Sequence, residues 1–317
     1  MRSLLRLTLN VAIPVLVSCG QNAKAQTVHL VAVGDVMMAR GVEAECHKHG
    51  WDYPFGNLSP ILLSADIAFG NLECPVSLRG TRMSRIINLR ADPACLPALK
   101  RAGFTMLSVA NNHAMDFGLT AFSDTLAGLR RQSIIPVGGG DTYSEATAGT
   151  IVEKRGLRIG FLGFCAFPDS AGATTPDQPS IGAMSDERLI RSVRSLRVKC
   201  DVVVVSCHWG VEGRTTHIPM QERLAHALID AGAALVLGHH PHVPQEIARY
   251  KGGVIVYSMG NCVFDSRNRG GRDGILVRCV LTKKGVGSFS SAAVTISKCR
   301  PSVSFPDKQG FSPLRGY

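Results

Sequence analysis

The chain has 317 residues, of which 45% are hydrophobic, so it can bury a substantial core, and a disordered chain is excluded. Its formal net charge is +11 at pH 7, which suits a neighbourhood of anionic polymer or lipid. Only 6% of the residues are aromatic, and no basic stretch carries interleaved aromatics of the kind that stack bases. We therefore expect no nucleic-acid partner and one large α/β domain.

Residues 1–25 have the pattern of a secretory signal. Arg2 and Arg6 precede an apolar run from Leu7 to Val17, which is too short to span a membrane. The end of this run resembles a bacterial lipobox, so we expect cleavage before Cys19 and a lipid anchor on that residue. The alternative is ordinary cleavage after Ala25. The sequence thus predicts an exported protein of the cell envelope, either a membrane-anchored lipoprotein or a periplasmic protein.

Beyond the signal, apolar runs alternate with helical patterns, which is typical of an α/β protein. The predicted strands cover residues 28–33, 64–70, 104–110, 134–137, 156–164, 201–206, 233–237, 253–258, 275–282 and 292–297. The predicted helices cover residues 93–102, 120–131, 185–199 and 219–231. Residues 168–179 have the composition of a long surface loop, a candidate lid. We expect residues 27–300 to form a single domain and residues 301–317 an irregular tail.

Five of the apolar strands end in side chains of the metal-ligand type. They are Asp35, Glu73, Asn112 with His113, His208, and His240 with His242. Because strand ends meet at one edge of a sheet, residues distant in sequence can converge there. Mixed carboxylate, amide and imidazole ligands suit manganese, iron or zinc, and one or two such ions could activate a water and bind a phosphoryl oxygen. The competing roles are a helix cap for Asp35, a solvated charge for Glu73 and a core position for His208.

Three histidines follow directly on the strand at 233–237, within AALVLGHHPHVPQ. Residues two apart on an extended stretch point the same way, so His240 and His242 are expected to face one point and His239 to face elsewhere. Neutral imidazole is the commonest metal ligand among side chains. A surface histidine cluster without an ion is the alternative, and which of the three bind stays open.

The segment after the strand at 104–110 combines an amide, an imidazole and a carboxylate. Asn112 can ligate a metal through its carbonyl oxygen, His113 can serve as a general acid, and Asp116 can orient that histidine. A helix N-terminus capped by Asn111 or Asn112 is the other interpretation. Upstream, Arg90 is a candidate clamp for an anionic group of a substrate, and an ordinary surface arginine is its alternative.

The chain has ten cysteines without a C-x-x-C pair, so a zinc ribbon is not expected. Export would permit disulfides. Cys279 and Cys299 lie on two late strand-like runs and could face each other across a pair of strands.

These segments together resemble the CapA family of poly-γ-glutamate capsule biosynthesis proteins, which belong to the calcineurin-like metallophosphatase superfamily. The matching blocks stand in the family's order and cover about residues 27 to 282. They are GDVMMARGVE from Gly34, FGNLECPVS from Phe69, ANNHAMDFG from Ala110, HWGVE from His208, GHHPHVPQ from Gly238 and YSMGNCVFD from Tyr257.

The resemblance implies a four-layer sandwich of two mixed β-sheets flanked by helices, with a metal centre at the strand ends. By similarity, His113 would protonate the leaving group and Glu73 would be the bridging carboxylate. One ion would be held by Asn112, His208 and His240, and the other by Asp35 and His242. The superfamily usually has a histidine two residues after the first aspartate. Met37 stands there in this chain, which leaves the number of ions open.

The resemblance also implies a function. We expect an exported, metal-dependent hydrolase of the phosphoesterase type in the biosynthesis of a poly-γ-glutamate capsule or another surface polymer. Its partners would be an anionic polymer or phosphoester substrate and the membrane proteins of a capsule synthase. The alternative, which Met37 motivates, is a non-catalytic polymer-binding or scaffold component of an envelope assembly complex.

Overall fold

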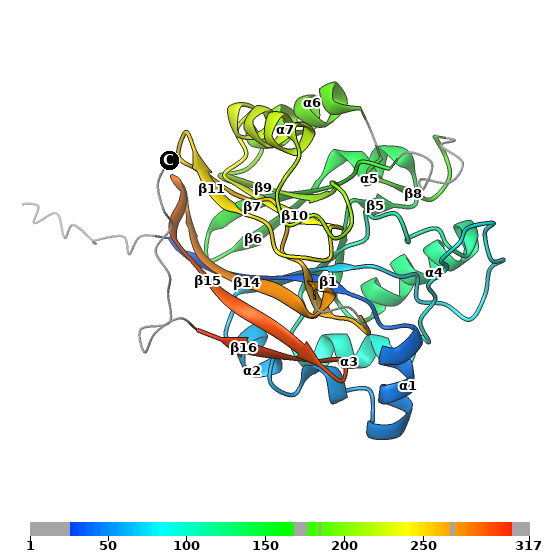
Figure 1. Cartoon of the computed structure of the whole chain (residues 1–317). Helices are drawn as coiled ribbons and strands as arrows, with labels where there is room; N and C mark the ends of the chain where they lie inside the picture. The colour runs from blue at the N-terminus through cyan, green and yellow to red at the C-terminus, as the bar shows by residue number, and fades with distance from the viewer. Residues whose placement is uncertain (1–25, 168–175, 184, 267–269, 306–317) are drawn as a thin grey trace, which may run out of the picture.

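The computed structural model describes residues 26–167, 176–183, 185–266 and 270–305. These residues form two mixed β-sheets that pack face to face, each with helices on its outer side (Figure 1). The four-layer α/β sandwich expected from the sequence is therefore confirmed. The predicted signal, Cys19 and most of the predicted loop at 168–179 lie outside the described residues.

The first sheet has eight strands in the order β16-β15-β14-β1-β2-β3-β4, and β13 pairs with the end of β1. Their bounds are β1 Val28–Val36, β2 Ile67–Leu72, β3 Met106–Ser108, β4 Ile135–Val137, β13 Asn261–Val263, β14 Asp273–Thr282, β15 Gly285–Ser297 and β16 Arg300–Ser304. Strands β1 to β4 run parallel, whereas β14 pairs with β1 in the antiparallel sense. The C-terminal ends of β1 to β4 therefore lie at the same edge of this sheet.

The second sheet has six strands in the order β11-β12-β10-β9-β7-β6. Their bounds are β6 Thr150–Lys154, β7 Leu157–Cys165, β9 Val202–His208, β10 Leu235–His239, β11 Ile247–Tyr250 and β12 Gly253–Val256. A further pair, β5 Gly139–Gly140 and β8 Ser180–Ile181, stands apart. The inner strands are parallel and nearly all apolar because both of their faces are covered.

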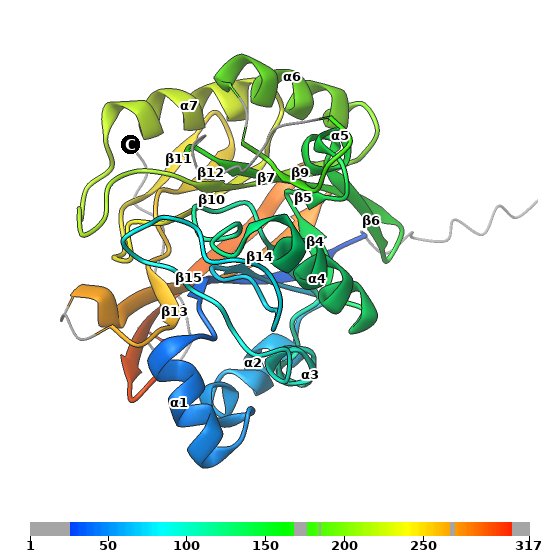
Figure 2. The same ribbon diagram turned by 90° about the vertical axis from the view of Figure 1, so that its right-hand side faces the viewer.

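Helices cover the outer faces of both sheets, as the turned view in Figure 2 shows. Helices α1 to α4 lie on the first sheet, and α6 and α7 lie on the second. The helix bounds are α1 Arg40–His49, α2 Ser59–Leu63, α3 Cys95–Ala102, α4 Gly118–Arg131, α5 Tyr143–Ala148, α6 Asp186–Arg197 and α7 Pro219–Asp230, with short 3₁₀ turns η1 Tyr53–Phe55 and η3 Gly270–Arg272. None of the helices in the described ranges is both long and apolar enough to cross a membrane.

Three apolar layers hold the sandwich together. The central layer lies between the sheets, where Phe69 of β2 stacks on Phe161 of β7 with ring centroids 5.7 Å apart. The outer layers join the first sheet to α1–α4 and the second sheet to α6 and α7. Burial of apolar area in all three layers fixes the two sheets against each other, and this sets the positions of their strand ends.

Some local expectations are wrong. Residues 301–304 belong to β16 and pair with β15, so the expected irregular tail does not begin at 301; residues 306–317 lie outside the description. Cys279 lies opposite Phe289 in the ladder and not opposite Cys299, and the nine cysteines among the described residues are all free and buried. Asp35 caps no helix, because Ala39 is the N-cap of α1.

Candidate metal centre

The predicted ligands lie at the C-terminal ends of strands from both sheets. Strands β1, β2 and β3 bring Asp35, Glu73 and Asn112, and strands β9 and β10 bring His208 and the histidine segment. The sequence predicted convergence at the edge of one sheet. The structure instead places the cluster where the strand ends of two packed sheets meet, so each sheet supplies part of the ligand set.

One group of ligand atoms comes from Glu73, His208 and His240, which all offer an atom within 4.8 Å of one another. Nε2 of His208 lies 3.6 Å from Oε1 of Glu73 and 2.8 Å from Oδ1 of Asn112. Both Glu73 and Asn112 therefore lie close to the same nitrogen of His208. The resemblance assigns Asn112, His208 and His240 to a single ion, with Glu73 as the bridging carboxylate.

A second group comes from Asp35, Glu73 and His242. Oε1 of Glu73 lies 3.6 Å from Nε2 of His242, and Oδ2 of Asp35 lies 3.5 Å from Nδ1 of the same ring. The two groups share Glu73. A carboxylate common to both is the arrangement expected of a ligand that bridges two ions.

Neighbouring amides orient these ligands. The side-chain amide of Asn71 donates to Oδ1 of Asp35 at 2.9 Å, and Asn111 in turn donates to Oδ1 of Asn71 at 3.2 Å. Oδ1 of Asn261 lies 2.9 Å from Nδ1 of His242, which turns the other ring nitrogen toward Glu73. Such supporting hydrogen bonds fix the ring orientation of ligating histidines. Asn111 therefore belongs to the site and does not act as the helix cap that the sequence allowed.

The site contains buried polar atoms that the protein itself leaves unsatisfied. Both carboxylate oxygens of Glu73 and Nδ1 of His240 are buried without a hydrogen-bond partner among the described residues. A buried polar atom left in this way is costly, and a cation would satisfy these atoms. The donor set of carboxylates, an amide oxygen and imidazoles therefore fits one or two divalent ions.

Burial and neighbouring charges shift the pKa values of the side chains in the cluster. Burial raises the pKa of Glu73 well above its usual range, and burial lowers the pKa of His208 well below its usual range. Burial also lowers the pKa of His240 to about 4. Burial works against the charged form of His242 too, but the charges of Glu73 and Asp35 outweigh it and raise its pKa to about 10.

The histidine segment turns sharply instead of running extended. His240 and His242 both have left-handed backbone conformations, with φ of 95° and 58°. Such conformations cost about 1–3 kcal/mol each outside glycine and persist mainly where function requires them. His239 does not face elsewhere, as the extended geometry had suggested: it is buried, and its Nδ1 lies 3.2 Å from Oδ1 of Asp35.

Beside the cluster, His113 and Asp116 form the predicted pair. Nδ1 of His113 lies 2.7 Å from Oδ2 of Asp116, which also accepts from the backbone N–H of Leu89 at 2.7 Å. His113 directly follows the candidate ligand Asn112, and its backbone N–H donates to Oδ1 of Asn111 at 3.2 Å. Arg85, which sequence reasoning missed, donates to Oδ1 of Asp116 at 3.3 Å and to the carbonyl oxygen of Asn112 at 2.5 Å.

Arg90 is exposed, and its guanidinium stacks on the ring of Phe117 at 4.2 Å. No contact seen among the described residues joins it to the cluster, so its expected role as a clamp stays a prediction. Arg85, which is anchored on Asp116 and on the backbone of Asn112, is the arginine that borders the site.

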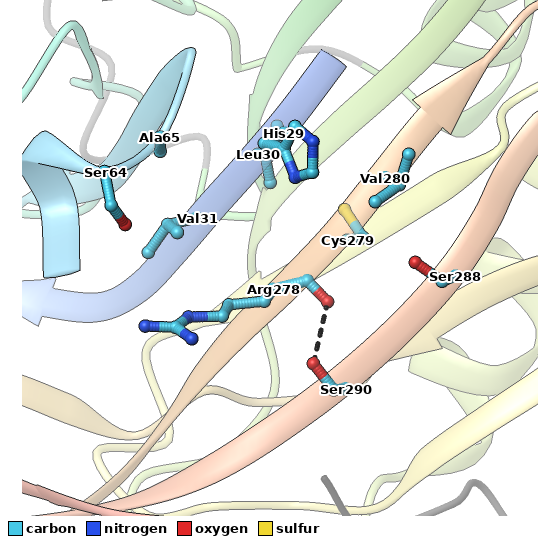
Figure 3. Close-up of a pocket in the computed structure, with 10 residues that line it drawn as sticks. All are labelled: His29, Leu30, Val31, Ser64, Ala65, Arg278, Cys279, Val280, Ser288 and Ser290. Carbon is cyan, nitrogen blue, oxygen red and sulfur yellow. Dashed lines mark hydrogen bonds between the residues drawn. The ribbon is translucent and has the colours of Figure 1, made fainter. Parts of the chain in front are cut away.

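A separate pocket opens at the other end of β1, between the start of that strand, the turn after α2 and strands β14 and β15 (Figure 3). His29, Arg278 and Ser290 line it. His29 lies six positions before Asp35 on the same strand, near its opposite end. This pocket is therefore distinct from the ligand cluster.

Comparisons with known proteins show which family the chain belongs to. The chain is 34% identical over 280 residues to the capsule biosynthesis protein CapA of Bacillus anthracis, covering 86% of this chain and 68% of that one. It is 36% identical over 272 residues to the PGA biosynthesis protein CapA of Bacillus subtilis strain 168, covering 85% of this chain and 72% of that one.

Among solved structures, a 5'-nucleotidase precursor from Thermus thermophilus matches with a TM-score of 0.53 at 14% identity, over 87% of this chain and 56% of that chain. This likeness identifies the fold as metallophosphatase-like. The family model described as bacterial capsule synthesis protein PGA_cap matches residues 29–266, which include every ligand of the candidate centre. The chain therefore belongs to the PGA_cap family of bacterial capsule synthesis proteins.

Proposed function

We propose that this chain is an exported, divalent-metal-dependent phosphoester hydrolase that acts in the biosynthesis of a poly-γ-glutamate capsule or another surface polymer. The observation that carries the proposal is the pair of ligand groups that share Glu73, with buried polar atoms that have no hydrogen-bond partner among the described residues and that a cation would satisfy. The two Bacillus relatives are named for capsule and PGA biosynthesis, which supports the polymer. The basic net charge is complementary to an acidic polymer.

The side chains of the site have two roles, metal binding and proton transfer. Bound manganese, iron or zinc would supply Lewis acidity toward a water and a phosphoryl oxygen. Glu73, with Asn112, His208 and His240 on one side and Asp35 and His242 on the other, would hold the ions. Asn71 and Asn261 keep Asp35 and His242 turned toward the centre.

His113 would handle the proton of the leaving group. Its Nδ1 faces the Asp116 carboxylate, so this nitrogen is engaged and Nε2 is the one left to deliver a proton to the departing oxygen. Asp116 is held in turn by the backbone of Leu89 and by Arg85. The pair is therefore positioned before substrate arrives, which is what efficient proton transfer requires.

Replacement of His113 tests the hydrolase directly. We expect His113→Asn, loaded with manganese, to lower the turnover of a chromogenic phosphodiester by about 10²–10⁴-fold, because a positioned general acid contributes that much. Its manganese content should equal that of the wild type, since His113 is not a ligand. The exposed His47→Asn on α1 is the matched control and should keep full activity. Absence of turnover in the manganese-loaded wild type would remove the hydrolase proposal.

The non-catalytic alternative has one observation in its favour, which is the replacement of a usual ligand by Met37. Polymer production in the source bacterium separates the two. Deletion should abolish the surface polymer, and wild-type protein should restore it. A hydrolase requires His113→Asn to fail in this complementation, whereas a scaffold requires it to succeed.

Export and anchoring can be measured on the same strain. We propose that Cys19 carries lipid, so radiolabelled fatty acid should appear in the wild-type protein and not in Cys19→Ser. Cleavage after Ala25 predicts instead an unlabelled, soluble envelope protein. Its N-terminal residue, read by mass spectrometry, decides between the two sites.

A further inference from the structure

A third group of ligand atoms lies at the same centre and includes one residue, Glu212, that the function proposed above does not use. The carboxylate of Glu212 comes within 4.8 Å of ring nitrogens of both His240 and His242. Glu212 lies in the segment that follows β9, and it is exposed. The group therefore borders the solvent side of the centre and shares one histidine with each buried ligand group.

Backbone hydrogen bonds hold this segment against the histidines. Before Glu212, the N–H of the buried Trp209 donates to the carbonyl of His239 at 3.1 Å. After it, the N–H of Gly213 donates to the carbonyl of Pro241 at 2.8 Å. The backbone on both sides of Glu212 is thus tied to the histidine segment, so the carboxylate is not free to drift from the centre.

Polar groups in this third cluster lack partners. No hydrogen bond or ion pair seen in the described ranges engages the carboxylate of Glu212. Nδ1 of His240, a residue only 6% exposed, is buried without a hydrogen-bond partner. The buried imidazole nitrogen is costly without a partner, and a cation held between it and the nearby carboxylate of Glu212 would satisfy it.

Met37 stands where the resemblance expects a further histidine ligand. Its side chain is fully buried, and its sulfur lies 3.1 Å from the backbone nitrogen of Ala39. The thioether is thus turned toward the backbone of the chain. The group of Asp35, Glu73 and His242 would then hold an ion with three side chains.

We propose that Glu212 is a metal-binding side chain on the solvent side of the centre, beside His240 and His242. The inference rests on the metal centre of the proposed function. Glu212 shares His242 with the group of Asp35 and Glu73, and it shares His240 with the other buried group. Because a carboxylate is a hard oxygen ligand, its addition to two imidazoles should favour manganese over zinc.

Titration of the metal-stripped full-length protein with MnCl₂, followed by calorimetry and by manganese electron paramagnetic resonance, tests the inference. We expect Glu212→Gln, which keeps the shape of the side chain, to bind its weakest manganese ion at least about 10-fold less tightly than the wild type, or not at all. The exposed Glu222→Gln, in the first turn of α7, is the matched control and should bind like the wild type.

Unchanged manganese affinity and stoichiometry in Glu212→Gln would overturn the inference, whether the wild type takes one ion or two. A wild type that binds no manganese would overturn it as well. A wild type that binds manganese but hydrolyses no phosphoester would instead contradict the proposed function, and the role of Glu212 in binding the metal would stand.

Discussion

At the scale of single residues, the metal-free centre holds protons where ions would bind. The charges of Glu73 and Asp35 raise the pKa of His242 to about 10, so its ring carries a proton at neutral pH. Imidazole must be deprotonated to ligate a metal, so an ion has to displace this proton.

This competition makes metal binding depend on pH. Since the pKa of His242 is raised to about 10, its ring keeps its proton throughout the range from pH 6.5 to 8.5. If the metal displaces this proton, the manganese affinity should rise about tenfold for each unit by which the pH is raised. Calorimetry in buffers of different ionisation enthalpy would measure the released protons. An affinity that does not change over this range would contradict the protonation state described here.

Residue types and their place at strand ends identified the ligands that the structure gathers. They did not identify the direction of each side chain. His239 was expected to face away, yet it contacts Asp35, because it is the last residue of β10 and lies on the same face as Leu235 and Leu237, which pack between the sheets. Glu212 and Arg85 were missed because each lies in an irregular segment, where sequence periodicity carries no information about direction.

At the scale of elements, the end of β10 is held in place by close backbone packing. Gly238 immediately precedes the histidines, and a Cβ at this position would lie 1.9 Å from the carbonyl oxygen of Tyr257. Only glycine fits there without displacing the chain. The strand therefore sets the position of His239, His240 and His242 through this contact.

We expect Gly238→Ala to destabilise the protein by about 1–3 kcal/mol, the usual cost of overpacking, and to weaken metal binding because the histidines must shift. Urea unfolding and manganese titration would measure both effects. Gly56→Ala is the control: the nearest atom to its Cβ would be Nη2 of Arg300 at 3.3 Å, the far end of a flexible side chain. Equal unfolding midpoints for the two variants would contradict the account.

Long apolar strands and clearly amphipathic helices were predictable from sequence. The helix expected at 219–231 is α7, Pro219–Asp230, and that expected at 185–199 is α6, Asp186–Arg197. Helix α1 was not predicted, because only Val42 and Cys46 of its residues are buried, and two apolar positions make no recognisable stripe. Strand β16 was missed in the same way, since its burial is sparse.

At the scale of the whole molecule, the centre exists because two sheets pack face to face. Local patterns indicate strands, but they do not assign a strand to a sheet. The prediction that two sheets pack together therefore came from the family resemblance alone. The central layer, with Phe69 stacked on Phe161, is what brings the end of β9 to the end of β2. Stability of the core and assembly of the site are therefore linked.

The cysteines give a prediction for the whole fold. Burial raises the pKa of Cys74 and of Cys279 to about 12, so their thiols are protonated as well as inaccessible. A thiol reagent should label none of the nine described cysteines in the native protein and all nine after unfolding. A reducing agent should leave the Tm unchanged. Fewer than nine reactive thiols after unfolding would reveal a disulfide and contradict this.

The most direct test of the central claim is anomalous diffraction at the manganese edge from crystals of the protein soaked in MnCl₂. We expect a peak between Glu73, His208 and His240 and, if two ions bind, a second between Asp35, Glu73 and His242. Absence of both peaks, with manganese elsewhere on the molecule or nowhere, would contradict it.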